Sequence, residues 1–262
     1  MQVIDTSDRN IGKVFGLIYG ASGTGKTHLM GTLGELGSVL LIDIDQGYKT
    51  IVNAPDLTPK MRGNITIVSF DKFGDLNTAY QLVDKNDPAA WVRVLDPKGE
   101  AGLVIDAPFD WIVWDTWSEI QWFMLQELRK QESKKDSGLL TGNMGKDINF
   151  RKNIGIQHWG MLTDLNKLAV ENLRECQVNQ IFTMQEKLEK DELLGTIYGG
   201  PAIHGKMVQE MPTYFDVVAR TYTDPTGKFC ATTKAKTRWP AKTRFGVGQD
   251  FVNPTMKQII GL

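Results

Sequence analysis

The amino-acid sequence predicts an α/β fold whose central sheet is mostly parallel and flanked by helices. Short apolar runs alternate with segments of helical spacing along all 262 residues, and the first run leads through a glycine-rich loop into a helix. The chain carries 30 Lys+Arg and 31 Asp+Glu, a net charge of -1. This balance excludes a polycation that coats nucleic acid by bulk charge, so we expect one globular domain in which nucleic-acid binding requires a local basic patch.

The first half of the chain divides into strands and helices by the spacing of its apolar residues. A continuous apolar run is typical of a strand buried on both faces, and recurrence at helical spacing indicates a helix. The predicted order is a strand at Val14–Tyr19, a glycine loop at 20–25, a helix from Lys26 to about Leu33, strands at Ser38–Ile44 and Asn64–Phe70, and a helix around Leu76–Val83.

Residues 86–109 interrupt this alternation. Two apolar stretches, Trp91–Leu95 and Leu103–Ile105, flank the turn-forming sequence Asp96-Pro97-Lys98-Gly99. Such a pattern is typical of a β-hairpin. We therefore expect a single domain spanning residues 1–262 with a hairpin inserted at about 86–109.

The second half continues the alternation and adds two long polar segments. Its predicted elements are a strand at Trp111–Asp115, a helix at Trp117–Leu128, a helix at His158–Arg174, a strand at Val178–Met184, a short helix, a strand at Asp216–Tyr222 and a last hairpin containing Lys228–Thr237. Between them, Glu132–Gln157 and Glu186–His204 have no clear periodicity. Irregular segments of this length are usually functional or disordered.

The sequence contains no membrane or secretion signal that we recognise. No apolar run approaches the roughly 18 residues needed to cross a bilayer, and the first residues lack a basic and apolar leader. Cys176 and Cys230 are too few for a disulfide framework or a complete zinc site. We expect a cytoplasmic protein whose cysteines are small buried hydrophobes.

A phosphate-binding motif follows the first strand. Residues 20–27 match G-x-x-x-x-G-K-[ST], in which the glycines let backbone N–H groups wrap an anion and the lysine contacts the β- and γ-phosphates. The Thr27 hydroxyl is suited to Mg²⁺. The sequence therefore predicts an ATP and Mg²⁺ site, whose nucleotide-binding residues are Gly20, Ala21, Ser22, Gly23, Thr24, Gly25, Lys26 and Thr27.

Two aspartates complete the predicted site. Asp115 ends an apolar strand, as a second magnesium-organising carboxylate does. Asp45 follows the second strand and is the better candidate to orient the attacking water, because Thr116 occupies the position directly after Asp115 and Glu119 lies on a solvated helix face. The alternative is that Asp45 is a structural turn residue.

In this order the motifs resemble the RecA-type recombinase core. That family has a P-loop, a strand ending in an acidic catalytic residue, a strand ending in Asp-Ser or Asp-Thr, and a strand ending in Gln. The matching positions here are Gly20–Thr27, Asp45, Asp115-Thr116 and Gln185. The resemblance implies that Gln185 senses the γ-phosphate and transmits that state to a DNA-binding loop.

The basic hairpin near the C-terminus carries a second resemblance. Lys234 and Lys236, followed by Pro240 and Lys242, are similar to the family's Lys-x-Lys strand end. The resemblance implies that both lysines reach the nucleotide of a neighbouring subunit, where cations stabilise charge on the transferring phosphoryl group. The alternative is a solvated basic hairpin.

The two polar segments occupy the positions of the family's DNA-binding loops. Basic residues there suit contacts to a phosphate backbone, and the alternative is an exposed loop without a partner. The predicted DNA-binding residues are Lys134, Lys135, Lys146, Arg151, Lys152, Lys187, Lys190 and Lys206.

Asp-x-Asp-x-Gly follows the second strand at Asp43, Asp45 and Gly47, and Gly205-Lys206 is followed by Tyr214-Phe215-Asp216. With these motifs the chain looks most like the phage RecA-like single-strand annealing proteins of the Sak group, which are also classed with phage AAA-type nucleotide-binding proteins. The resemblance covers about residues 12–246, apart from 86–109. The resemblance implies a DNA-stimulated ATPase in the host cytoplasm that assembles as a filament or ring on single-stranded DNA, promotes annealing or recombination, and partners a single-strand-binding protein. Asp45 is shorter than the family's usual Glu, which predicts slow hydrolysis. A P-loop kinase, another small-molecule NTPase and a non-hydrolysing ATP switch remain alternatives.

Overall fold

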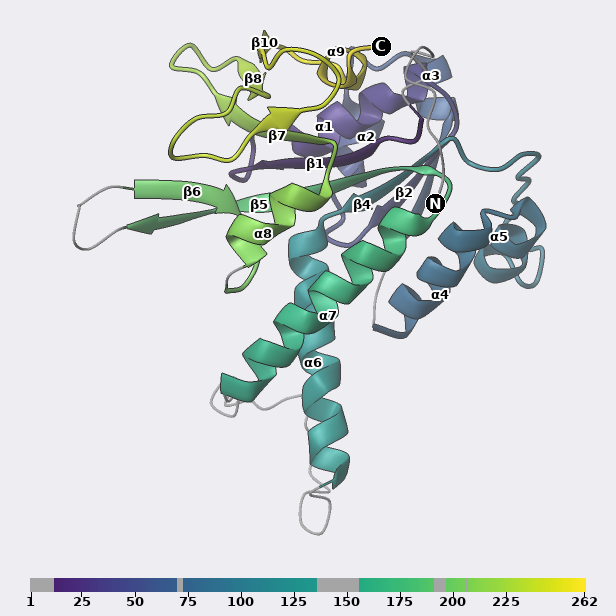
Figure 1. The fold of residues 1–262 in the computed structure, drawn as a ribbon. Helices are drawn as coiled ribbons and strands as arrows, with labels where there is room; N and C mark the ends of the chain where they lie inside the picture. The colour runs from purple at the N-terminus through teal and green to yellow at the C-terminus, as the bar shows by residue number, and fades with distance from the viewer. Residues whose placement is uncertain (1–11, 70–72, 136–155, 191–196, 206) are drawn as a thin grey trace, which may run out of the picture.

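The computed structural model describes residues 12–69, 73–135, 156–190, 197–205 and 207–262. Within these ranges the strands join into one ten-stranded sheet with the main order β10-β8-β7-β1-β5-β4-β2-β3, to which β6 and β9 add at β5 and β7 (Figure 1). The strands are β1 Phe15–Gly20, β2 Val39–Asp43, β3 Ile65–Ser69, β4 Trp111–Asp115, β5 Asn179–Lys190, β6 Ile197–Pro201, β7 Val217–Thr223, β8 Phe229–Thr232, β9 Lys242–Thr243 and β10 Asp250–Val252.

The centre of this sheet is parallel, as the sequence predicts. Strands β7, β1, β5, β4, β2 and β3 all pair in parallel, and the additions β6, β8, β9 and β10 are antiparallel. The carboxyl ends of β1, β2, β4 and the parallel part of β5 therefore meet at one edge. The predicted α/β fold of P-loop NTPase type is confirmed, and β7 and β8 form its C-terminal antiparallel hairpin.

Helices cover both faces of the sheet (Figure 1). The helices are α1 Lys26–Gly31, the 3-10 turn Thr32–Glu35, α2 Tyr48–Asn53, α3 Pro59–Gly63, α4 Phe73–Lys85, α5 Pro88–Leu95, α6 Trp117–Lys135, α7 Ile156–Glu175, α8 Met207–Tyr214 and α9 Met256–Ile260. One core lies under α4 to α8, where Trp117 packs against Trp114 and Phe182 at ring centroid distances of 5.7 and 4.9 Å. The other core lies under α1, α2 and α9 and contains Leu29, Leu41 and Ile260.

The hairpin predicted at about 86–109 is wrong. Trp91–Leu95 belongs to helix α5, which begins at Pro88 and is capped by the Asp87 side chain accepting from Ala89 N. The predicted turn does form, with Gly99 N donating to Asp96 O at 3.1 Å, but residues 103–105 form no strand. An aspartate cap followed by proline in the first helical turn favours a helix, and this signal overrides the β-like Val-Arg-Val alternation.

The segment predicted to be irregular at Glu186–His204 is largely a β-hairpin. Strand β5 continues past its parallel part to Lys190 and pairs antiparallel with β6, in register from Glu186 opposite Pro201 to Lys190 opposite Ile197. The last four residues of this strand, 187–190, are exposed and three of them are charged, so their side chains gave no apolar pattern. Main-chain hydrogen bonds to β6 form it instead.

The other polar segment is shortened at both ends. Helix α6 continues to Lys135 and α7 begins at Ile156, so Lys134 and Lys135 lie on the last turn of a helix. The predicted DNA-binding residues Lys146, Arg151, Lys152 and Lys206 lie outside the described residues. No helix in the described part of the chain is long and apolar enough to span a bilayer.

Candidate nucleotide-binding site

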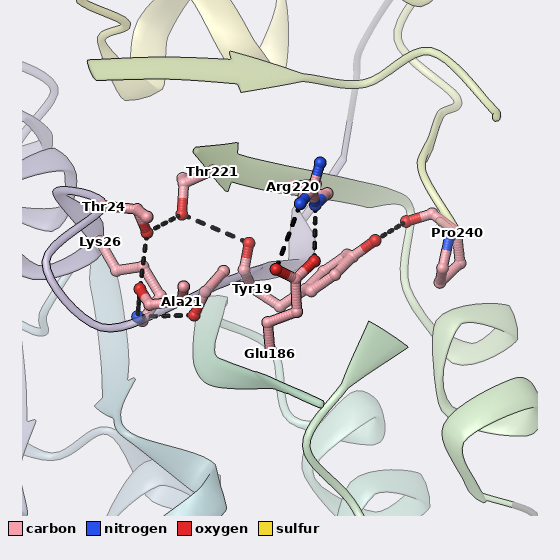
Figure 2. Close-up of polar contacts among 9 residues, drawn as sticks. Tyr19, Ala21, Thr24, Lys26, Glu186, Arg220, Thr221 and Pro240 are labelled. Carbon is pink, nitrogen blue, oxygen red and sulfur yellow. Dashed lines mark hydrogen bonds and ion pairs between the residues drawn. The ribbon is translucent and has the colours of Figure 1, made fainter. Parts of the chain in front are cut away.

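The P-loop connects β1 to α1 and is fixed against β7. The Thr24 hydroxyl lies 2.8 Å from both the Ala21 carbonyl and the Thr221 hydroxyl, and the latter also bonds the Tyr19 carbonyl (Figure 2). Gly20 is required where the loop leaves the sheet, because a Cβ there would lie 2.4 Å from the Thr221 carbonyl oxygen. Gly23 and Gly25 have φ angles of 76° and 82°, which glycine adopts without strain.

The Lys26 side chain folds back into this loop. Its Nζ donates to the carbonyls of Gly20 at 2.9 Å and Ala21 at 2.8 Å, and only 7% of the residue is exposed (Figure 2). Burial lowers the pKa of Lys26, and the negative charges of Asp115 and Asp45 oppose that shift. The ammonium is therefore a buried cation held by neutral acceptors, an arrangement that favours a bound anion.

Thr27 and Asp115 face each other across the sheet edge. The Thr27 hydroxyl donates to Asp115 Oδ2 at 2.7 Å, and the Thr183 hydroxyl donates to Asp115 Oδ1. Asp115 is 1% exposed, and burial raises its pKa despite these two hydrogen bonds. The predicted pairing of a P-loop threonine with the aspartate at the end of β4 is thus present in the structure.

Two more carboxylates stand beside Asp115. One oxygen each of Asp43, Asp45 and Asp115 lies within 4.8 Å of the others. Asp45 is exposed beyond the end of β2 rather than at its tip, while Asp43 is buried, and burial is the main cause that raises the Asp43 pKa to about 6. A ligand role for Asp43 was not predicted, although the Asp-x-Asp-x-Gly spacing after a buried strand is a signal for one.

A divalent cation fits this group of oxygens. Gly47 N donates to Asp43 and Asp45 at 2.9 and 3.1 Å, and a Cβ at Gly47 would lie 3.0 Å from Thr27 Oγ1 and 3.3 Å from Asp115 Oδ2. Glycine therefore keeps the space between these oxygens open. Carboxylate and hydroxyl oxygens are the donors that Mg²⁺ prefers.

Gln185 joins the site from β5. It stands opposite Gly20 in the parallel register, and its Oε1 accepts from Lys26 Nζ at 3.4 Å. The expected strand ends at Gln185, whereas the observed strand β5 continues past it into the hairpin with β6. The structure thus brings together Lys26, Thr27, Asp45, Asp115 and Gln185, which the sequence predicted from four separate segments.

A family model described as an AAA domain matches residues 13–245. The chain belongs to this AAA domain family. No curated protein sequence matches the chain. Among solved structures, the chain is similar to the crystal structure of the RadB recombinase, with 14% sequence identity, a TM-score of 0.46, and coverage of 92% of this chain and 87% of that chain.

The AAA domain contains a largely buried ion pair next to Gln185 that the sequence did not predict. Arg220 on β7 donates from Nε to Glu186 Oε1 at 2.6 Å and from Nη2 to Oε2 at 3.2 Å (Figure 2). The Glu186 side chain is 6% exposed and that of Arg220 is 20% exposed. The partners are 34 residues apart in the sequence, so no local spacing pointed to the pair.

The two lysines expected to act in trans bind an aspartate of the same chain. Lys234 Nζ lies 2.8 Å from Asp250 Oδ2, and Lys236 Nζ lies 3.9 Å from Asp250 Oδ1. Both follow the end of β8 instead of lying in a hairpin strand, and both side chains are about half exposed, at 51% and 47%. A role at a neighbouring subunit's nucleotide stays a prediction.

The remaining predicted DNA-binding residues lie on the β5–β6 hairpin of the AAA domain. Lys187 Nζ pairs with Glu189 Oε1 at 2.6 Å, and Lys190 is exposed at the last position of β5. Both therefore belong to a strand with fixed backbone pairing. The irregular loop expected at these two positions is therefore a strand, and DNA binding by Lys187 and Lys190 stays a prediction.

A cavity of about 290 Å³ opens beside the P-loop. It is lined by Thr24 and Gly25 of the loop, by His28 of α1 and by Phe229 of β8. The His28 and Phe229 rings lie nearly parallel, with centroids 6.4 Å apart, and His28 Nε2 lies 2.9 Å from Asp56 Oδ1. No residue was predicted to contact a nucleobase, and the local signal for this cavity is His28, directly after the P-loop threonine.

Proposed function

We propose that this AAA domain binds and hydrolyses Mg²⁺·ATP and couples the nucleotide to assembly on single-stranded DNA for annealing or recombination. One observation carries the proposal. Lys26, the phosphate-binding lysine, contacts Gln185, and Thr27, a cation-binding residue, contacts Asp115 beside it. Gln185 lies on β5, the strand that continues into the β5–β6 hairpin. A change at the γ-phosphate therefore acts directly on an element that projects from the domain.

The triphosphate would lie along the P-loop with its phosphates facing Lys26. Backbone N–H groups of the loop and of the start of α1 bind the phosphates, and Lys26 exchanges its carbonyl partners for phosphate oxygens. The nucleoside would extend into the 290 Å³ cavity, where Phe229 offers an aromatic face to the base. Thr27 and Asp115 would hold Mg²⁺, which would supply positive charge beside the phosphates.

Asp45 would orient the attacking water. It is the exposed member of the carboxylate group, so its oxygens are accessible to water. Water orientation by a carboxylate lowers the barrier to in-line attack. Its short side chain and the competing bond to Gly47 N at 3.1 Å favour slow turnover, so that ATP acts mainly as an assembly switch.

The partners we propose are single-stranded DNA, further copies of this chain as a filament or ring, and a single-strand-binding protein. The exposed lysines Lys187 and Lys190 support contacts to a phosphate backbone. Lys234 and Lys236 are held by one exposed carboxylate, Asp250, and an exposed ion pair exchanges partners at low cost. In an assembly they would leave Asp250 for the neighbour's phosphates.

Hydrolysis measured with and without single-stranded DNA tests this function. We expect phosphate release to be slow alone and stimulated by oligo(dT), and to be lost in Asp45→Asn with ATP affinity retained. Turnover that ignores DNA but requires a small phosphate acceptor would indicate a kinase instead. Unchanged DNA annealing in Asp45→Asn, with loss in Lys26→Ala, would indicate a switch that binds ATP without hydrolysing it.

A further inference from the structure

A groove of about 790 Å³ lies between the β5–β6 hairpin, helix α8 and the segment 236–240, and we call it the hairpin groove. Two aromatic residues, Tyr198 and Trp239, line it together with Lys187, Lys236, Arg238 and Glu189. Lys187 is neutralised by Glu189 at 2.6 Å, whereas the Arg238 guanidinium has no ion-pair partner among the residues that the structure describes. The groove is therefore cationic and partly aromatic.

The indole of Trp239 is held in place by its neighbours. The Arg220 guanidinium carbon lies 4.6 Å from the Trp239 ring centroid, and Arg220 is itself fixed by Glu186. On the hairpin side, a Cβ at Gly199 would lie 2.1 Å from Trp239 Nε1, so only glycine lets the hairpin approach the indole this closely. A fixed aromatic ring loses little conformational entropy when a ligand stacks on it.

The segment that carries Trp239 is tied to the nucleotide site. The Tyr19 hydroxyl, one residue before the P-loop, donates to the Pro240 carbonyl at 2.7 Å (Figure 2). Gly199 N of β6 donates to the Arg238 carbonyl at 2.8 Å. The segment 236–240 is thus bonded to β1, which ends at Gly20 of the P-loop. The hairpin wall is bonded to β5, which passes through Gln185.

We propose that the hairpin groove binds an unpaired nucleobase of single-stranded DNA, with the base stacked on Trp239 and Tyr198 and its phosphate bound by Arg238. Every base has a π-face, so aromatic stacking is tolerant of sequence, and cations along the same groove follow the backbone. The proposal rests on the proposed single-stranded DNA binding. It assigns a base contact to Trp239, which the sequence did not mark.

The test compares two oligonucleotides with the same phosphates, oligo(dT) and an abasic strand of equal length, by fluorescence anisotropy with the full-length protein. We expect Trp239→Ala to weaken oligo(dT) binding by about 5- to 100-fold, because stacking on that ring is lost, and to leave abasic binding unchanged. Trp239→Phe retains an aromatic face and restores most of the affinity. Tyr198→Ala lowers oligo(dT) affinity in the same selective way.

Arg238→Ala tests the phosphate contact. It should weaken both strands equally and reduce the slope of log affinity against log salt by about 1, since one phosphate contact is lost. Arg93→Ala is the matched control, because Arg93 is an exposed arginine on α5, with 75% of its side chain exposed. ATP affinity and melting temperature, measured without DNA, report whether each variant is folded.

The outcomes separate this proposal from the function on which it rests. If the wild-type protein binds neither strand, the proposed function is overturned. If the wild-type protein prefers oligo(dT) and the variants Trp239→Ala and Tyr198→Ala keep that preference, only the proposal about the hairpin groove is overturned. If Trp239→Ala does not fold, the exposed Tyr198 decides the question through Tyr198→Ala against Tyr198→Phe. A change in oligomeric state without a change in the oligo(dT)-to-abasic ratio would make the groove a contact between copies, which also overturns the proposal.

Discussion

The nucleotide site and the basic segment after β8 both contain lysines and aspartates, but the lysine and two of the three aspartates of the nucleotide site are buried, whereas these side chains are exposed in the basic segment. Lys26 is 7% exposed and bound to two carbonyls, whereas the Lys234 side chain is 51% exposed and bound to Asp250. Burial raises the pKa of Asp115, whereas a hydrogen bond from Lys234 lowers that of Asp250. Charges at the first region are poorly solvated without ligand, and those at the second already satisfy each other.

This difference assigns different tasks to the two regions. Buried groups that carry unfavourable charge gain stability when a triphosphate and a cation arrive, so they favour tight binding of a small ligand. Exposed ion pairs contribute little to stability and exchange partners easily, so they suit contacts that form and break with assembly. The two strands that join the regions are β1 and β5, and Tyr19 and Gln185 lie on them.

Lys26→Ala should have the largest effect on the nucleotide region. Loss of the buried ammonium removes a charge-assisted contact to phosphate, so we expect ATP affinity to fall by at least about 100-fold in isothermal titration calorimetry. Lys98→Ala is the matched control, since the Lys98 side chain is 76% exposed on the loop after α5. Near-normal ATP affinity in Lys26→Ala would disprove the site.

The double variant Lys234→Ala/Lys236→Ala tests the exposed region in the assembly. Cations delivered to a neighbour's phosphates stabilise transition-state charge, so DNA-stimulated turnover should fall by about 10- to 100-fold. Affinity for ATP, measured on dilute protein without DNA, should change by less than about twofold, because Asp250 is their partner within the chain. Full DNA-stimulated turnover in this variant would remove the trans role.

Asp43→Asn should stabilise the ligand-free protein. The folded pKa of Asp43 is about 6, whereas the unfolded value is 3.8, so ionisation of this carboxyl opposes folding. The protein therefore loses stability as the pH rises above about 4, and the loss is complete above about 6. At pH 7.5 the variant should gain about 1–3 kcal/mol in chemical denaturation, and below pH 4 the gain should vanish. The same variant should respond less to Mg²⁺·ATP. A loss of stability at pH 7.5 would show that Asp43 acts as a structural acceptor only.

The sequence predicted the nucleotide region well because its chemistry is local. The P-loop is one continuous motif, and parallel strands bring the residues after their carboxyl ends to a single edge, which placed Asp45, Asp115 and Gln185 near Lys26. The parts that sequence reasoning missed depend on partners far along the chain. Glu186 meets Arg220 only through the pairing of β5, β1 and β7, and the alternation within Trp91–Leu95 concealed a helix started by Asp87-Pro88.

The charged hairpin was missed for a related reason. Side-chain patterns report burial, and β5 beyond Glu186 is exposed, so only its backbone pairing with β6 defines that part of the strand. The strand therefore looks like a polar loop in the sequence. The same exposure keeps its charged residues available to a ligand, so the region hardest to predict is also the region where we place DNA.

Asp250→Asn is the counterpart of Asp43→Asn and should have the smallest effect, with the opposite sign. The folded pKa of Asp250 lies below its usual value because Lys234 and Thr232 donate hydrogen bonds to the carboxylate, so its ionised form favours folding above the unfolded pKa and the benefit is lost as pH falls. The Lys234 side chain is 51% exposed and that of Asp250 is 43% exposed, and exposed ion pairs contribute little to stability. Chemical denaturation at pH 7.5 should therefore show that the free energy of unfolding falls by no more than about 0.5 kcal/mol. This loss should shrink in high salt, whereas the gain in Asp43→Asn should persist, because salt screens exposed charges far more than buried ones. Equal effects of the two substitutions would mean that the two regions do not differ in the way their surroundings indicate.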